Sequence, residues 1–259
     1  MESILQNVIL ERASVRNFDK DKKVEKTILE KILLAGVRAP SAGNIQPRTI
    51  IHVEDKTIRE SLFQLCERQA FMMDAPVWLV VCVDLHRHIK AARLTGVEYD
   101  FTGAVPFVLG VIDASLSLEN MVLAAEAVGL GSVIVGSVIE HPEEVREILH
   151  LPDHCLAISI LCVGYPKRRP LVKEKWSSSI IVPQDSYRDV ELRDVAEYWK
   201  SSVAAGLRRS GKNPSDEEID RVSAETNYGK TYASHYKEDF IRSSSENLMS
   251  YLKKHGFLK

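Results

Sequence analysis

The sequence of 259 residues lacks most of the features that would assign it to a specialised class. It has four cysteines, Cys66, Cys82, Cys155 and Cys162, and no two of them have the Cys-x-x-Cys spacing of metal or redox sites. Cys82 and Cys162 fall in apolar, β-like runs, so we interpret them as small buried side chains. The 34 basic and 36 acidic residues give a formal charge of −2, which argues against nucleic-acid binding driven by overall basicity.

Signals for membranes and for several common catalytic folds are also missing. No uninterrupted apolar run approaches the ~20 residues that cross a bilayer, and residues 1–5 show no cationic stretch before an apolar core. We therefore expect no membrane span, no signal peptide and a cytoplasmic location. There is no Gly-x-Ser-x-Gly elbow and no P-loop. The glycines of 129–136 have the wrong spacing for a dinucleotide fingerprint and follow a helical pattern rather than a strand.

What is present is a regular alternation of strand-like and helix-like segments. Apolar, β-branched runs predict buried strands at 49–53, 77–83, 131–138 and 157–163. Helical spacing predicts helices within 2–12, 25–37, 55–70, 106–128, 142–149, 185–209 and 228–255. Strands interleaved with helices imply a sheet covered by helices.

The polar segment at residues 84–104 is too mixed to assign. His86 and His88 alternate after a strand pattern and could share one face, but no further ligand follows at zinc-like spacing. We interpret them as solvated histidines at an exposed strand end. Tyr99 and Phe101 make the segment a candidate substrate lid, with a variable surface insertion as the equal alternative.

Two short segments carry the chemistry. Arg12, Ser14 and Arg16 alternate along the chain, and two guanidinium groups with a hydroxyl can saturate the oxygens of a phosphate monoester. The segment 39–47, Ala-Pro-Ser-Ala-Gly-Asn-Ile-Gln-Pro, is a turn of small and amide residues that lets a flat polar ring lie near the backbone. Together they indicate a phosphorylated heterocyclic cofactor.

These segments resemble the two N-terminal signatures of the nitroreductase family of FMN-dependent oxidoreductases. The first is Arg-x-Ser-x-Arg-x-Phe, ending here at Phe18, and the second is Pro-Ser-x-x-Asn-x-Gln-Pro. The resemblance continues through Asp-Ala-Pro at 74–76, a helical segment at 113–129, the turn at 129–132 and Val-Gly-Tyr-Pro at 163–166. It covers roughly residues 8–182.

The resemblance implies a set of FMN-binding residues. The phosphate and ribityl end would be held by Arg12, Ala13, Ser14 and Arg16. The segment beside the ring would comprise Pro40, Ser41, Asn44 and Gln46, with Gln69 near the pyrimidine side. A backbone amide of Val135 or Gly136, next to Ile134, would face flavin N5, so no catalytic side chain is expected. A late basic residue would return to the phosphate, for which we choose Lys175 and then Lys173.

Two positions depart from many relatives. Val133 and Ile134 occupy a stretch where a tryptophan is frequent, and Arg48 stands where a tryptophan often follows Gln-Pro. Both departures concern the shape of the substrate pocket rather than the phosphate grip.

The implied fold is an α+β, nitroreductase-like α/β/α sandwich with a central, mostly antiparallel sheet. Residues 1–182 would form the FMN-binding domain, and 183–259 a helical extension that packs on the partner of a homodimer with FMN at the interface. The implied reaction moves a hydride from NADH or NADPH through flavin N5 to an electron-poor acceptor such as a nitroaromatic or quinone. Alternatives are a flavin-binding protein without nicotinamide turnover, a dehalogenase or flavin-degrading enzyme of the same fold, and a chance match that binds no flavin.

Overall fold

A computed structural model describes residues 4–259, which fall into two compact units. The first unit extends to Pro170 and also includes Ser243–Lys259, and the second is Leu171–Arg242. Whether 183–259 acts as an extension that packs on a partner stays a prediction.

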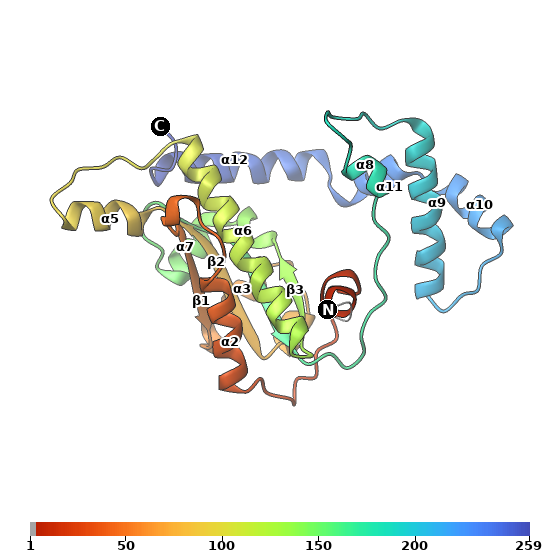
Figure 1. Cartoon of the computed structure of the whole chain (residues 1–259), viewed down its shortest axis with the longest axis horizontal. Helices are drawn as coiled ribbons and strands as arrows, with labels where there is room; N and C mark the ends of the chain where they lie inside the picture. The colour runs from red at the N-terminus through yellow and green to blue at the C-terminus, as the bar shows by residue number, and fades with distance from the viewer. Residues whose placement is uncertain (1–3) are drawn as a thin grey trace. The chain divides into compact units, whose positions relative to one another are not determined.

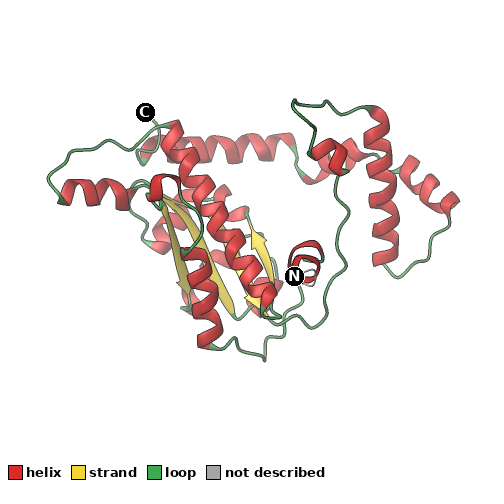
Figure 2. Cartoon of the chain, in the orientation of Figure 1, coloured by secondary structure: helices red, strands yellow, loops and turns green. Residues whose placement is uncertain are grey.

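The first unit is built on a four-stranded antiparallel sheet (Figures 1 and 2). Along the sheet the strands follow the order β1-β2-β4-β3, so β1 and β3 form its two edges. Their bounds are β1 Arg48–Val53, β2 Val77–Asp84, β3 Gly131–Val135 and β4 Cys155–Gly164. All eight residues of β2 are buried, as expected for a strand covered on both faces.

Alternate residues of β2 enter two separate hydrophobic cores, because successive side chains of a strand point to opposite faces. Trp78, Val80 and Cys82 pack among residues of α3 (Lys56–Leu65), α4 (Phe71–Asp74) and α7 (Pro142–Leu149). The intervening valines and leucine face α2 (Lys26–Val37) and α6 (Ala104–Ala127), which lie on one face of the sheet in Figure 1. The predicted α/β/α sandwich with an antiparallel sheet is confirmed.

The end of the chain closes the second of these cores. The buried Tyr251, in α12 (Glu238–Lys254), donates a hydrogen bond of 2.7 Å to the Cys155 carbonyl at the start of β4. His255 lies 2.8 Å from Asp153 through Nδ1 and 3.1 Å from Glu143 through Nε2. The C-terminal part of α12 is therefore part of the first unit's core.

The second unit is helical. It contains α8 (Ser178–Ile181), α9 (Leu192–Arg209), α10 (Asp216–Glu225), α11 (Tyr228–His235) and the first residues of α12. Trp176 stacks on Tyr198 with ring centroids 4.4 Å apart, and Tyr228 meets both rings edge-on.

Several sequence predictions need correction. The helix predicted over 55–70 ends at Leu65, because Glu67 and Arg68 adopt left-handed backbone angles. The strand predicted over 131–138 ends at Val135, and Ser137–Glu140 forms a 3-10 turn. Within 2–12, Leu5–Leu10 forms a single π-helical segment, and residues 1–3 lie outside the described residues. In 228–255, Tyr236 interrupts the helix.

The histidines and the long apolar helix also differ from expectation. His86–Leu94 forms helix α5, so His86 and His88 do not end a strand. No group of three or more metal-ligating side chains occurs within residues 4–259. The expectation about apolar runs was too strong, because α6 is long and apolar enough to cross a membrane by length and composition. Its buried face packs on the sheet, as in the core helix of a folded domain.

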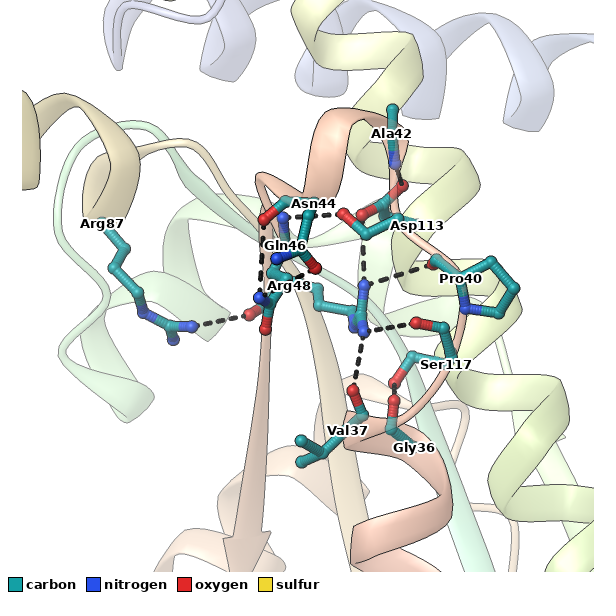
Figure 3. A network of polar contacts seen from close by, with 12 residues as sticks. Gly36, Val37, Pro40, Ala42, Asn44, Gln46, Arg48, Arg87, Asp113 and Ser117 are labelled. Atoms are coloured by element: carbon teal, nitrogen blue, oxygen red, sulfur yellow. Dashed lines mark hydrogen bonds and ion pairs between the residues drawn. The ribbon is translucent and has the colours of Figure 1, made fainter.

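A buried ion pair joins β1 to helices α2 and α6, which cover one face of the sheet (Figure 3). Arg48 Nη1 lies 3.1 Å from Asp113 Oδ2 of α6, and both side chains are at most 5% exposed. The guanidinium also donates to the carbonyls of Val37, Ala39 and Pro40, where α2 ends. The charge of Arg48 is thus paired and its donors are used, which a buried charge requires.

Removing either member of this pair should destabilise the protein strongly. We expect Arg48→Met to lower the free energy of unfolding by about 3–5 kcal/mol, because Asp113 is then left as an unpaired buried charge. Chemical denaturation followed by circular dichroism measures the loss. Arg48→Met combined with Asp113→Leu should cost less than the sum of the two single changes. Strict additivity would contradict the pairing.

Candidate functional site

The segment carrying the first signature runs beside the edge strand β3. Val15 N donates to the Ser132 carbonyl at 2.9 Å, and Phe18 forms a β-bridge with Pro166. Val15 is fully buried, and a Cβ on Gly131 would lie 2.4 Å from its Cγ2, so the close approach requires glycine. Because side chains alternate along an extended chain, Ser14 and Arg16 point the opposite way from Val15 and are at least partly exposed.

A buried carboxylate near the start of β3 interacts electrostatically with two arginines. Glu126, in the last turn of α6, forms an ion pair with Arg169, whose Nη2 also donates to the Leu130 carbonyl at 2.8 Å. Burial raises the pKa of Glu126, and the nearby charges of Arg169 and Arg12 oppose that rise. Arg169 and Arg12 thus both act on the same buried carboxylate, at the end of β3 where the sequence predicts the phosphate.

The other end of β3 brings together Gln69 and the segment predicted to face flavin N5. Gln69 Nε2 donates to Ser137 Oγ at 3.3 Å, directly after Gly136. A Cβ on Gly136 would meet nothing within 4 Å, so open space borders its backbone, and Ile134 is 41% exposed. Arg16 lies over Phe71, with 5.6 Å from the guanidinium carbon to the ring centroid.

The second signature forms a tight turn before β1 (Figure 3). Ser41 Oγ accepts the backbone N–H of Gln46 at 2.7 Å, and Gln46 Nε2 donates to Asn44 Oδ1 at 3.3 Å. Asn44 and Gln46 have φ angles of 57° and 55°, the left-handed region that non-glycine residues rarely adopt. Asp113 Oδ1 accepts the N–H of Ala42, so the Arg48 ion pair also anchors this turn. Pro40, Asn44 and Gln46 are exposed, and Ser41 is half-buried.

The structure does not bring the two signatures together within one chain. The first lies along β3 and the second precedes β1, at the opposite edge of the sheet, about 14 Å away at ~4.8 Å per strand spacing. Helix α6 gives a second estimate of the distance between the two signatures. Asp113 holds the Ala42 turn and Glu126 holds Arg169, and their separation is about 20 Å along the axis at ~1.5 Å per residue.

The two lysines chosen for the late basic residue lie in the second unit, where both are exposed. Nothing within either unit tests whether Lys173 or Lys175 contacts the flavin phosphate, so that role stays a prediction. The residue that sequence reasoning passed over is Arg169, in the charged run just before them. Lys167 belongs with it, because its backbone N–H donates to the Asn17 carbonyl at 2.9 Å and fixes the loop beside the first signature. The charged run that contains Arg169 is visible in the sequence, but the sequence does not reveal which of its residues turns back toward the sheet.

The residues along β3 fit a flavin phosphate and ring. Within residues 4–259 Ser14 Oγ and the Arg16 guanidinium have no hydrogen-bond partner, so charge-assisted donors are available to an anion. The open backbone at Gly136 leaves room for a planar ring to approach a main-chain donor. The cysteines take no part, since all four are buried and burial raises the pKa of Cys66 to about 12.

Comparisons with known proteins agree with this geometry. The family model "Nitroreductase family" matches residues 9–70 and 62–165. An NADPH-flavin oxidoreductase of Vibrio harveyi is 32% identical over 173 residues, 67% of this chain and 70% of the relative. An FMN reductase [NAD(P)H] of Bacillus subtilis is 32% identical over 181 residues, 69% of this chain and 72% of the relative.

The fold extends this likeness over nearly the whole chain. The crystal structure of nitroreductase A from Vibrio parahaemolyticus has a TM-score of 0.83 and 26% identity, and the match covers 99% of this chain and 98% of that one. The resemblance predicted from the two signatures is confirmed, and a chance match is ruled out. The chain belongs to the nitroreductase family.

Proposed function

We propose that the protein moves a hydride from NADH or NADPH to an electron-poor acceptor such as a nitroaromatic or quinone, in two alternating half-reactions. It is an FMN-dependent NAD(P)H oxidoreductase, as the family and the flavin and FMN reductases among its relatives indicate. The observation that carries the proposal is the row of available donors along β3. It runs from Arg12, Ser14 and Arg16 to the open backbone at Gly136.

Each group of residues along β3 has a separate task. Arg12, Ser14 and Arg16, with Arg169 and the 167–169 loop, bind the phosphate through charge-assisted hydrogen bonds. Gln69 orients the pyrimidine side, and a backbone N–H at Val135 or Gly136 donates toward N5. When bound, FMN supplies the centre that accepts and passes on a hydride. The protein's part is to hold donor and acceptor in stacked alignment over it.

The proposed assembly is a homodimer with the flavin at the interface. A flavin held along β3 lies at the opposite edge of the sheet from Pro40, Ser41, Asn44 and Gln46 of its own chain, so a second chain would have to provide that turn. The exposed face of α6 supports such contact, with a stripe of Val105, Val108, Ile112 and Leu116 that are 40–70% exposed. Large exposed apolar stripes mark interaction sites.

The extension supports the same assembly. Residues 171–192 expose Leu171, Ile181, Val182 and Leu192, each at least 62% accessible. We propose that this segment, which leads into the predicted extension 183–259, contacts the partner chain together with that extension. Lys173 and Lys175 remain candidates for a late contact with the phosphate.

Arg16→Ala tests the phosphate grip. Loss of one charged hydrogen-bond donor should weaken FMN binding by about 10–100-fold. Fluorescence quenching of FMN titrated with apoprotein measures the dissociation constant. Arg221→Ala, on the exposed face of α10, is the matched control and should bind FMN as the parent does. Unchanged affinity in Arg16→Ala would remove this residue from the site.

Ile112→Glu tests the dimer. A carboxylate within an apolar contact should raise the dimer dissociation constant about 100-fold or more, since burying an unpaired charge is costly. Sedimentation equilibrium measures the constant, and bound flavin should fall in parallel. Val97→Glu, an equally exposed apolar residue in the loop after α5, should leave both unchanged. A dimer that survives Ile112→Glu would place the interface elsewhere.

The first experiment on function is a visible spectrum of protein purified with added FMN, before and after anaerobic NADPH or NADH. Bleaching of the flavin bands by either nucleotide supports the reaction and justifies a screen of acceptors. Bound flavin that neither nucleotide reduces would favour a flavin-binding protein without nicotinamide turnover.

A further inference from the structure

A groove with basic walls lies between α5 and the turn that precedes β4. Its volume is about 510 Å³, and its walls include His86, Ile89, Lys90, Arg93 and His154. Figure 1 shows α5 at one side of the first unit, leading into the loop that starts α6. The groove is formed in part by the polar segment 84–104, to which the proposed flavin site assigns no residue.

Three basic residues face the groove from one side of α5. His86, Lys90 and Arg93 recur at the four- and three-residue intervals that align side chains along a helix. Within the described chain, residues 4–259, the side chains of His86 and Lys90 form no ion pair. Arg93 Nε lies 3.7 Å from Glu98, and both side chains are at least 66% exposed, so this pair is weak and easily exchanged.

His154 is held in an unusual conformation on the opposite wall. Its φ is 60°, in the left-handed region. Its N–H donates to the His255 carbonyl at 3.0 Å, and its own carbonyl accepts the N–H of Leu85 at 2.9 Å. The ring occupies a notch over Gly256, where a Cβ would lie 2.5 Å from Nε2. Strained residues that their surroundings fix so firmly cluster at binding sites.

The groove is also lined by one carboxylate, Asp153, and Asp100 lies near His154; both acidic groups have basic partners. Asp153 accepts from Arg146 Nη2 at 3.1 Å and from His255 Nδ1 at 2.8 Å. Asp100 pairs with Lys259 and accepts the Thr102 hydroxyl. Lys90 has no ion pair within residues 4–259, and Arg93 has only the long, exposed contact with Glu98, so the charge left available in the groove is positive and suits an anion.

The ring of His154 provides a hydrogen bond rather than a full charge. Burial lowers its pKa, and the neighbouring His86 and Arg93 add to that effect against the opposing pull of Asp153 and Asp100. A neutral imidazole at pH 7 can donate one N–H to an anion held by the lysine and arginine.

Apolar side chains adjoin the basic ones. Ile89, Leu94 and Pro152 line the same groove. We propose that this groove binds a phosphate monoester carried on a compact apolar group, at a site separate from the flavin phosphate. Lys90 and Arg93 hold the phosphate oxygens, and the apolar residues contact the rest of the ligand.

Phenyl phosphate has this chemistry and serves as the probe. It is titrated by calorimetry into protein saturated with FMN, so that the flavin's own phosphate site is filled. We expect one binding event per chain. In Lys90→Ala with Arg93→Ala it should be at least about tenfold weaker, because two charged donors are lost.

Lys31→Ala with Arg221→Ala removes the same charges from exposed faces of α2 and α10 and should bind as the parent does. No binding, or equal affinity in both double variants, would overturn the proposal. Side-chain 15N resonances of His86 and His154 should move on titration, and their invariance would also overturn it. Competition between NADP⁺ and phenyl phosphate would identify a nicotinamide nucleotide as the source of the phosphate. If NADP⁺ does not compete, the phosphate belongs to a separate metabolite.

Discussion

The strand order β1-β2-β4-β3 is the constraint on which the rest of this structure depends. Two hydrophobic layers enclose the sheet, and the two buried central strands fix β1 and β3 at its edges. The first-unit residues proposed to bind the flavin phosphate or N5 lie along β3, whereas the Ser41–Gln46 turn precedes β1. Because the core lies between the edges, neither group can move toward the other without unfolding the sheet. The proposed site is complete only when a second chain supplies one of the groups.

Buried charges position both groups. Arg48 and Asp113 connect the end of α2, the start of β1 and the middle of α6, and Asp113 also accepts the N–H of Ala42. Glu126, farther along the same helix, holds Arg169 in an ion pair and is also influenced by the charge of Arg12. Helix α6 thus anchors one half of the site from its middle and the other half from its last turn, while its exposed apolar stripe offers the proposed contact between chains. The same helix links cofactor binding to assembly.

The sequence allowed prediction of those features that depend on neighbouring residues. The alternation of Arg12, Ser14 and Arg16 and the buried run of β2 are local patterns. The structure confirms the buried strand, and the phosphate-binding role of the other three residues stays a prediction. The Arg48–Asp113 pair joins positions 65 residues apart, so only the fold reveals it. Helix α5 escaped prediction because it is a short, mostly polar helix with no buried residue. The early end of α3 depends on left-handed angles at Glu67 and Arg68, which carry no glycine or proline signal.

A mixture of two defective chains tests the shared site most directly. Arg16→Ala disables the β3 side, and Ser41→Ala with Asn44→Gly disables the turn while tolerating its left-handed backbone at Asn44. Each variant alone should retain little FMN. If the two chains are refolded together, each mixed dimer has one site with both defects and one intact site, so flavin binding should return. Mixed dimers that stay free of flavin would show that both groups serve the same chain and would contradict the account.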